Sequence, residues 1–271
     1  MFVLARLEAA LLPTKEKVLA QYQSNPSTPE KIFESITGYK YYNTSKHTLK
    51  NLLNEPDAIK DNFLDYLDGY SKRVKDIIEN LKFKEQVDTL ASTGRLFTVV
   101  KKFSELDLSP STVDSMRMCY MFEDIIRRFS ENEEAGSHYT PREVIALMVN
   151  LLLMEADEEL FVDNKEIKVL DMAAGTGGML ATAKSYIQQL NPKVNVRLFG
   201  QEYLDETYGI GKADMLIRQE ESDYFVKTDT LKDSDPFHDK KMNFVIANPP
   251  FGQSWGGKDA DDGVEQAVKA D

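Results

Sequence analysis

A short run near the end of the chain combines residue types suited to holding a planar amino group. Asn248, Pro249, Pro250 and Phe251 follow the apolar residues 244–247. Because proline lacks a backbone N–H and fixes φ, the run indicates a strand that ends in a rigid turn. The Asn248 side-chain oxygen and the Pro249 carbonyl offer two acceptors for amino protons, and Phe251 offers a π-face for a ring. Taken alone, the run is equally compatible with an ordinary Asn-Pro turn.

A glycine-rich turn lies between an expected strand and an expected helix. The strand covers residues 167–171 and ends at Asp171, and the helix covers residues 179–190 with apolar residues at helical spacing. Glycines permit a tight turn and a close approach of the backbone to a ligand. The turn alone is compatible with NAD, a flavin, a phosphate or no ligand, and the missing Gly-Lys-Ser/Thr ending disfavours a P-loop. The candidate binding residues in it are Gly175, Thr176, Gly177 and Gly178.

Acidic residues follow two further expected strands. Glu202 ends the strand 196–202, and Asp229 follows the strand 225–228. In dinucleotide-type folds such an acid accepts hydrogen bonds from ribose hydroxyls, but Glu202 lies further from Asp171 than the roughly 20 residues typical of NAD binders. Asp229 is placed to accept a bond from a nucleobase amino group. The alternatives are a solvated strand end for Glu202 and a simple turn residue for Asp229.

Residues 140–143 have the form of a helix start. Thr140 is followed by Pro141, Arg142 and Glu143, which is a capping-box pattern with proline at the first helical position. The free N–H groups and the positive dipole end of such a helix suit a carboxylate ligand. A plain helix start without a ligand explains the pattern equally well.

Together these motifs resemble those of a known family. Residues 171–178 resemble the S-adenosylmethionine (SAM) motif of DNA adenine methyltransferases, and residues 248–251 resemble their catalytic motif. Residues 137–142 and 200–202 resemble segments of the modification (M) subunit of type I restriction-modification systems. The resemblance is residue by residue over about 137–252, and before that it concerns architecture alone. The chain departs from the family pattern at Met172, Ala174 and Met179, and it stops soon after the catalytic motif, so a truncated domain is expected.

The resemblance implies a function. It implies methyl transfer from SAM to the N6 amino group of a flipped adenine in duplex DNA, with Asn248, Pro249, Pro250 and Phe251 as catalytic residues. It implies as partners a DNA-specificity subunit, a second M subunit and, in the full complex, a restriction subunit. It places SAM against Ser137, His138, Tyr139, Thr140, Pro141, Arg142, Asp171, Gly175, Thr176, Gly177, Gly178, Glu202 and Asp229.

Composition and charge limit these possibilities. One cysteine, Cys119, excludes an internal disulfide, and no Cys/His spacing indicates a metal site. No apolar run is long enough to span a membrane, so we expect no membrane partner and a cytoplasmic location. The net charge is −12, made up of −2 over residues 1–140 and −10 over residues 141–271. Since DNA affinity normally comes from Lys and Arg, much of the positive surface must come from another subunit or from a missing part.

The expected fold is α/β, with an all-helical N-terminal domain at 1–135 and a Rossmann-like methyltransferase domain at 136–271, incomplete at its C-terminus. Helices are expected over residues 45–53 and 56–81, and a mobile acidic tail over residues 260–271. Three other functions remain open. The first is a methyltransferase of RNA or of a protein glutamine amide. The second is a non-catalytic SAM-binding assembly subunit, and the third is a nucleotide-dependent oxidoreductase, which residues 248–251 disfavour.

Overall fold

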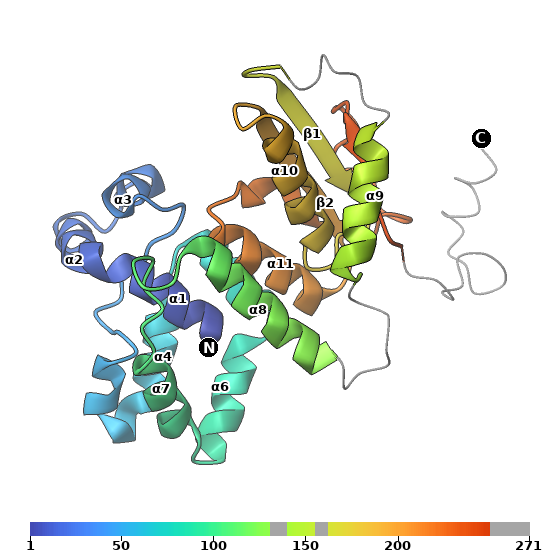
Figure 1. Cartoon of the computed structure of the whole chain (residues 1–271). Coiled ribbons are helices and arrows are strands. Elements are labelled where there is room, and N and C mark those ends of the chain that lie inside the picture. Colours follow the sequence, from blue (N-terminus) through green and yellow to red (C-terminus); the bar gives the residue numbers. More distant parts are fainter. Residues whose placement is uncertain (131–139, 155–161, 250–271) are drawn as a thin grey trace. The chain divides into compact units, whose positions relative to one another are not determined.

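The computed structural model describes residues 1–130, 140–154 and 162–249 (Figure 1). The chain divides into two compact units. The first contains Met1–Ile126 together with Lys212–Glu220, and the second contains the described residues of 127–211 and 221–249. The first unit is helical and the second holds a parallel sheet, which confirms the expected order of a helical part followed by an α/β part.

The first unit is built from short helices joined by turns. Most residues of α1 are buried, and Phe63, Leu67 and Val74 from later helices are fully buried as well. The helix α7 contacts both α1 and α4, and α4 contacts α5. The elements are α1 (Phe2–Leu11), η1 (Leu12–Thr14), α2 (Lys15–Ser24), α3 (Glu30–Thr37), η2 (Asn51–Asn54), η3 (Pro56–Ala58), α4 (Ile59–Asp68), α5 (Lys72–Asn80), α6 (Phe83–Ser92), α7 (Leu96–Ser104) and α8 (Ser115–Ser130).

Polar side chains anchor α1 in this unit. The buried guanidinium of Arg6 donates from Nη1 to the carbonyls of Leu108 and Val113, each at 2.7 Å. The Glu8 carboxylate accepts the Leu49 N–H at 2.9 and 3.0 Å. Because a buried charged group needs such partners, α1 is fixed against segments that lie far from it in the sequence.

The predicted extents of the two helices over residues 45–53 and 56–81 are wrong. The first is only the short 3-10 turn η2, and the second is broken into η3, α4 and α5. The break occurs because residues 42–44 pair with residues 69–71 in an antiparallel β-bridge: the Thr44 N–H donates to the Gly69 carbonyl (2.8 Å), and the Ser71 N–H donates to the Tyr42 carbonyl (3.0 Å). A Cβ at Gly69 would lie 2.5 Å from Asn43 Oδ1, so this β-bridge requires glycine at position 69.

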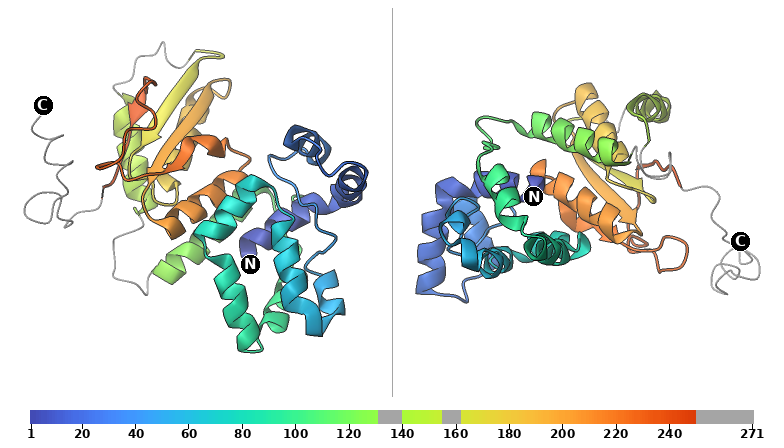
Figure 2. Two further views of the ribbon diagram at one scale, coloured as in Figure 1. Left: turned by 180° about the vertical axis from the view of Figure 1, so that it is seen from behind. Right: turned by 90° about the horizontal axis from the view of Figure 1, so that it is seen from below.

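Four parallel strands form the sheet of the second unit, in the order β3-β2-β1-β4. Asp171 lies opposite Gly200 in the β1–β2 pair, and Leu170 lies opposite Val245 in the β1–β4 pair. Seen from behind, β1 (yellow) runs between β2 (gold) and β4 (red-orange) (Figure 2). The strands are β1 (Glu166–Asp171), β2 (Asn195–Glu202), β3 (Phe225–Lys227) and β4 (Phe244–Val245). Because the strand order reverses between β1 and β4, the carboxyl ends there form a topological switch point, where open parallel sheets bind ligands.

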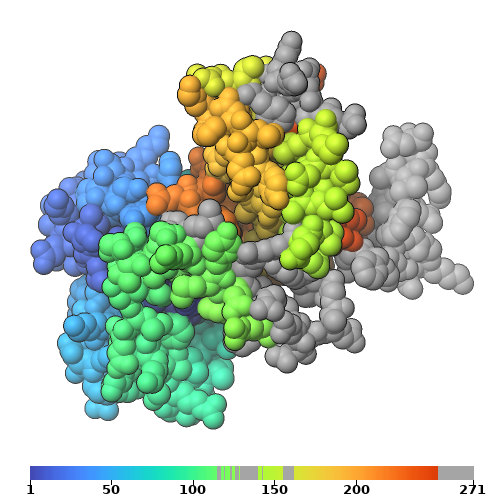
Figure 3. Space-filling model, viewed as in Figure 1, coloured from blue at the N-terminus to red at the C-terminus, as the bar shows by residue number. Residues whose placement is uncertain are grey.

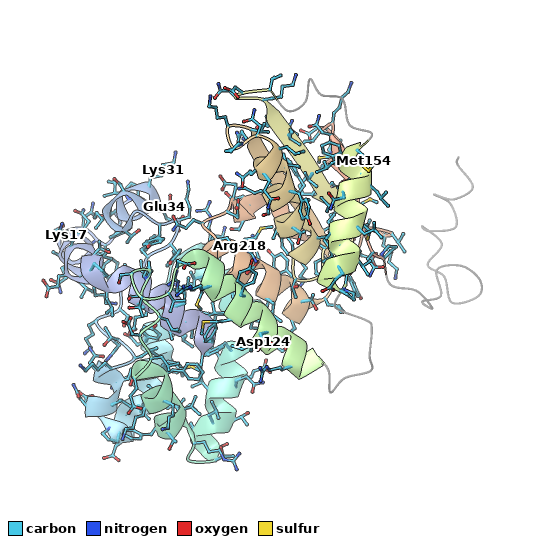
Figure 4. All side chains as sticks on the ribbon, in the orientation of Figure 1. Lys17, Lys31, Glu34, Asp124, Met154 and Arg218 are labelled. Carbon is cyan, nitrogen blue, oxygen red and sulfur yellow. The ribbon has the colours of Figure 1, made fainter. Side chains whose placement is uncertain are left out.

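Helices connect and cover these strands. They are α9 (Arg142–Met154), α10 (Gly178–Leu190) and α11 (Asp205–Ile217), with the turn η5 (Ser222–Tyr224) before β3. α9 lies alongside α10 (Figure 1) and buries Ile145 and Val149. The space-filling view shows α9 in yellow-green and α10 in gold on one face of the molecule (Figure 3). The helix α9 also carries an exposed apolar stripe that ends at Met154, which is labelled in Figure 4. The stripe consists of Val144, Leu147, Leu151 and Met154.

The ring of Phe225 packs tightly against glycine backbone. A Cβ at Gly200 would lie 2.7 Å from the ring atom Cε2, and a Cβ at Gly211 would lie 2.6 Å from Cζ. The ring also stacks on Tyr208, with centroids 5.9 Å apart. The two glycines therefore allow α11 and β2 to close on β3, which brings the ends of β2 and β3 into register.

Candidate active site

The carboxyl ends of all four strands lie along one edge of the sheet. Asp171 ends β1, Glu202 ends β2, Asp229 follows β3 and Asn248 follows β4. The pairing of β4 with β1 continues past Val245, because the Ile246 N–H donates to the Leu170 carbonyl at 2.9 Å. Four of the residues singled out from the sequence are thus placed at the same edge by topology.

Asp171 is fully buried at the end of β1. Its Oδ1 accepts the Ala173 N–H at 3.0 Å, while Oδ2 is buried and has no hydrogen-bond partner in the described part of the chain. Burial raises the pKa of this carboxyl to about 7; the nearby Glu202 carboxylate adds to the rise, and the Ala173 N–H opposes it. An unpartnered buried acceptor of this kind suits a cationic ligand group.

The glycine turn between β1 and α10 has the conformation that its composition predicts. Gly175 (φ +55°) and Gly177 (φ +82°) adopt left-handed conformations, which side chains other than glycine rarely tolerate. The turn is held against β2 by the Ala174 N–H, which donates to the Gln201 carbonyl at 2.9 Å. A Cβ at Gly178 would meet no atom within 4 Å, so there is open space beside the first turn of α10. Thr176 in the same turn is half-buried.

Glu202 supports this turn directly. Its Oε2 accepts the Gly175 N–H at 2.9 Å, and its Oε1 accepts the Leu204 N–H at 2.8 Å. Each carboxylate oxygen retains a second lone pair, so Glu202 can still accept a ligand hydroxyl. Its support of the glycine turn was not visible from sequence spacing.

A polar network joins the ends of β1, β2 and β3. The Thr230 hydroxyl lies 2.7 Å from the Met172 carbonyl and 2.9 Å from Oε1 of Gln201. The Gln201 amide in turn donates to Asp235 Oδ1 at 3.1 Å. Sequence reasoning did not single out Thr230 or Gln201 as linked; the available signal was the polar Gln201 directly after the run Leu198, Phe199 and Gly200 in β2.

Asp229 shapes the turn after β3. Its Oδ1 accepts the Leu231 N–H at 3.0 Å, and its own N–H donates to Asp233 Oδ2 at 2.7 Å. This is the local side-chain-to-backbone pattern of an Asx turn. Asp229 is half-buried, and within the described residues its other oxygen, Oδ2, has no hydrogen-bond partner and is available to a ligand.

Exposed apolar side chains accompany the acids at this edge. Met172 follows β1, Tyr203 follows β2 and Leu231 comes four residues after β3, with exposed fractions of 40%, 64% and 61%. Apolar and aromatic groups beside carboxylates suit a ligand that combines a flat ring with hydroxyl groups.

Asn248 meets the segment that begins α9. Its Nδ2 donates to the Thr140 hydroxyl oxygen at 2.9 Å. The Pro141 carbonyl accepts the Ile145 N–H at 3.0 Å, and Arg142 is the first residue of α9. Pro249 is exposed. The remaining candidates, Ser137, His138, Tyr139, Pro250 and Phe251, lie outside the described residues, as does the tail 260–271.

Two negative findings apply to residues 1–130, 140–154 and 162–249. Within these ranges, no group of three or more His, Cys, Asp or Glu side chains is placed to hold a metal ion. No helix within them is long and apolar enough to cross a membrane.

Comparison with known families covers most of the chain. Residues 114–269 match the family model described as N-6 DNA Methylase, and residues 1–103 match the HsdM N-terminal domain. The structure of a type I restriction-modification methyltransferase subunit from Streptococcus thermophilus is similar with a TM-score of 0.70 at 20% identity, covering 94% of this chain and 58% of that one. At this identity the similarity concerns the fold.

Curated relatives with similar sequences are named as methylase subunits. The chain is 27% identical over 188 residues to the type I restriction enzyme MjaIX methylase subunit of Methanocaldococcus jannaschii, covering 68% of this chain. It is 30% identical over 149 residues to the HindI methylase subunit of Haemophilus influenzae, covering 53% of this chain. The aligned part spans 31% of the length of each relative.

Proposed function

Because the chain belongs to the N-6 DNA methylase family, we propose that the full-length protein methylates the N6 amino group of adenine in duplex DNA. We propose further that it acts as the modification subunit of a type I restriction-modification system, as its relatives are named. One observation carries the proposal: the glycine turn with its two acids and the Asn248 amide lie at the same sheet edge, on either side of the β1–β4 switch point.

The residues along this edge fit SAM. The unpartnered Oδ2 of Asp171 would face the positively charged part of the cofactor, since a cation offsets the cost of a buried carboxylate. The open space at Gly178 lets the cofactor approach the turn closely. Glu202 and Asp229 would accept bonds from its ribose and adenine, and the helix start at residues 140–142 would bind its carboxylate. When bound, SAM supplies an electrophilic methyl group on a sulfonium centre.

Asn248 and Pro249 would hold the target nitrogen. The adenine lies inside the base stack, so it must be flipped out before any side chain reaches it. The Asn248 side-chain oxygen and the Pro249 carbonyl then accept the two N6 protons, which directs the nitrogen lone pair toward the methyl group. As the bond from N6 to the methyl carbon formed and the methyl–sulfur bond broke, positive charge would develop on N6, and both oxygens would stabilise it. The extra proton leaves N6 after transfer, so no side chain needs to act as a strong base. We propose that Phe251 stacks on the flipped ring.

Charge indicates how DNA is bound. Residues 141–271 carry a net charge of −10, whereas DNA binding requires Lys and Arg opposite the phosphates. We therefore propose that a DNA-specificity subunit supplies most of the affinity and the sequence recognition. A second modification subunit, and a restriction subunit in the complete assembly, would complete this complex in the cytoplasm.

Methylation assays test the proposal directly. The full-length protein with its specificity partner is incubated with labelled SAM and with duplex DNA, RNA or protein. Label should enter DNA adenine, and Asn248→Ala should lower the rate at least about 100-fold, the usual cost of removing a group that stabilises developing charge. SAM affinity should stay unchanged by calorimetry, because Asn248 contacts the adenine.

Two controls sharpen the test. Asn150→Ala removes an exposed asparagine amide on α9, whose hydrogen bond in the described part of the chain goes to the Ala146 carbonyl of the same helix, and should leave the rate unchanged. Glu202→Gln should weaken SAM binding, because the Nε2 that replaces one oxygen cannot accept a hydrogen bond. Label entering RNA or protein in place of DNA would contradict the proposal, as would an active Asn248→Ala variant.

A further inference from the structure

The hydrogen bond between Thr140 and Asn248 joins two motifs that lie 108 residues apart. The Asn248 Nδ2 donates to Thr140 Oγ1 at 2.9 Å. Asn248 is exposed, and no backbone bond of a regular strand or helix restrains it, since β4 ends at Val245. The Thr140 hydroxyl is the partner that the described structure provides for this side chain.

The orientation of the Asn248 amide decides whether the proposed reaction can occur. The oxygen and the NH₂ group of an asparagine are nearly equal in size, so packing does not select which one faces a ligand, and hydrogen bonding must do so. A threonine hydroxyl can accept from the amide nitrogen or donate to the amide oxygen, so the amino group of the substrate selects the orientation and the hydroxyl then accepts from Nδ2. Only the oxygen accepts protons from an amino group. A flipped amide would present N–H donors to the adenine N6 group, which is itself a donor, and the two would repel.

We propose that Thr140 is a positioning residue that holds the Asn248 side chain in place by accepting from Nδ2 while Oδ1 faces the substrate, an inference that rests on the proposed function. With Nδ2 bound to Thr140, Oδ1 is directed to the other side of the amide carbon. Within residues 1–130, 140–154 and 162–249, Oδ1 has no hydrogen-bond partner and stays available for the N6 protons.

The backbone that carries Thr140 is well anchored. Thr140 directly precedes Pro141, whose carbonyl accepts the Ile145 N–H in the first turn of α9. Ile145 and Val149 form the buried face of this helix, with exposed fractions of 3% and 0%. A hydroxyl on such a support loses little further freedom on binding the amide, so the contact is able to hold the Asn248 side chain in place before substrate arrives.

Two substitutions at Thr140 test this role in the full-length protein with its specificity partner. Thr140→Val keeps the side-chain shape and removes the hydroxyl, and it should lower kcat for DNA methylation about three- to tenfold, as expected for one lost orienting hydrogen bond. Thr140→Ser keeps the hydroxyl and should restore most of kcat. Each kcat is measured at saturating SAM, so a change in SAM affinity at the helix start of residues 140–142 does not affect the comparison. Thr89→Val, on α6 of the helical unit, is the matched control and should behave as wild type.

Each outcome separates this inference from the proposed function. An inactive wild type, or an active Asn248→Ala variant in the same assay, would refute the proposed function itself. An active wild type with an inactive Asn248→Ala variant and an unchanged kcat for Thr140→Val would overturn only the role of Thr140. Weakened SAM binding with unchanged kcat at saturating SAM would also overturn it, because the hydroxyl would then act on the cofactor.

Discussion

Replacing Asp171 with asparagine should make protein stability less dependent on pH. The substitution removes a buried negative charge with almost no change in shape, and the asparagine oxygen can still accept the Ala173 N–H. The folded-state pKa of Asp171 lies at about 7, above its ordinary value of 3.8, because burial disfavours the charged form. The folded protein therefore binds this proton more tightly than the unfolded chain does. As a result, the free energy of unfolding falls as pH rises from about 4 through about 7, and it is level above that.

The two pKa values set the size of the effect. At pH 5 the Asp171 carboxyl of the folded protein is still protonated, so much of the free-energy penalty for ionising this buried group is absent. At pH 8 it is ionised, and the penalty is fully present. Integrating the proton linkage between these limits gives a loss of roughly 2–3 kcal/mol for the wild type that the asparagine variant should not show. Since Asp171 is 0% exposed, solvent screening does not reduce this figure.

Urea unfolding of both proteins at pH 5 and pH 8 measures this difference. The difference in unfolding free energy between variant and wild type should move in favour of the variant by roughly 2–3 kcal/mol from pH 5 to pH 8. Saturating SAM provides a second comparison. If a cationic part of the cofactor approaches Oδ2, SAM should stabilise the wild type more than the variant at pH 8.

Parallel pH profiles for the two proteins would refute this reasoning. Such a result would mean that the Asp171 carboxyl is solvated or already paired with a cation when the cofactor is absent. A variant that is less stable than the wild type by the same amount at every pH would lead to the same conclusion.

Two pairs of substitutions, one pair in each unit, test the packing by urea unfolding. Gly200→Ala should destabilise the protein by about 1–3 kcal/mol, because the added methyl would collide with the Phe225 ring. Gly178→Ala, where a Cβ meets open space, should leave stability unchanged or raised by up to about 1 kcal/mol while weakening SAM binding; equal stability losses at the two glycines would contradict this picture. Arg6→Met should cost about 2–4 kcal/mol by leaving two carbonyls without their charged donor, whereas Arg117→Met on the exposed side of α8 should cost less than about 0.5 kcal/mol. A neutral Arg6→Met would show that water replaces the guanidinium.

The α/β part of the fold was predictable because its signals are local. Each strand is a short apolar run bounded by a turn, and the expected strands 167–171 and 196–202 differ from β1 and β2 by a single residue at the start. The expected helix 179–190 begins one residue late relative to α10. Parallel pairing followed from the alternation of strands and helices, because a parallel connection needs a crossover helix.

The helical part was less predictable because non-local pairing overrides its periodicity. The apolar spacing through residues 56–81 is helical throughout, yet the helix ends at Gly69, where residues 42–44 form an antiparallel β-bridge with residues 69–71. Nothing in the local pattern reports a partner some 25 residues away in the sequence. Periodicity identifies the buried face of a helix and leaves its interruptions open.

Residue types at the candidate site were predictable, and their mutual contacts were not. Asp171, Glu202 and Asn248 were identified from strand ends and glycine spacing. The bond from Gly175 to Glu202 and the bond from Asn248 to Thr140 depend on how the turns fold back on the sheet. These partners are separated by 27 and 108 residues, so their contacts can be placed only once the strand order is known.

The packing around Phe225 has a consequence for how this family changes during evolution. The ring occupies the space that side chains at positions 200 and 211 would need, so the three positions share one volume. A smaller residue at 225 would free room for alanine at either glycine, whereas an alanine that arises first meets the ring and is removed by selection. Substitutions should therefore occur in a preferred order, with ring loss at 225 preceding side-chain gain at 200 or 211. Relatives should show these three positions covarying, although none of the three residues needs to touch a substrate.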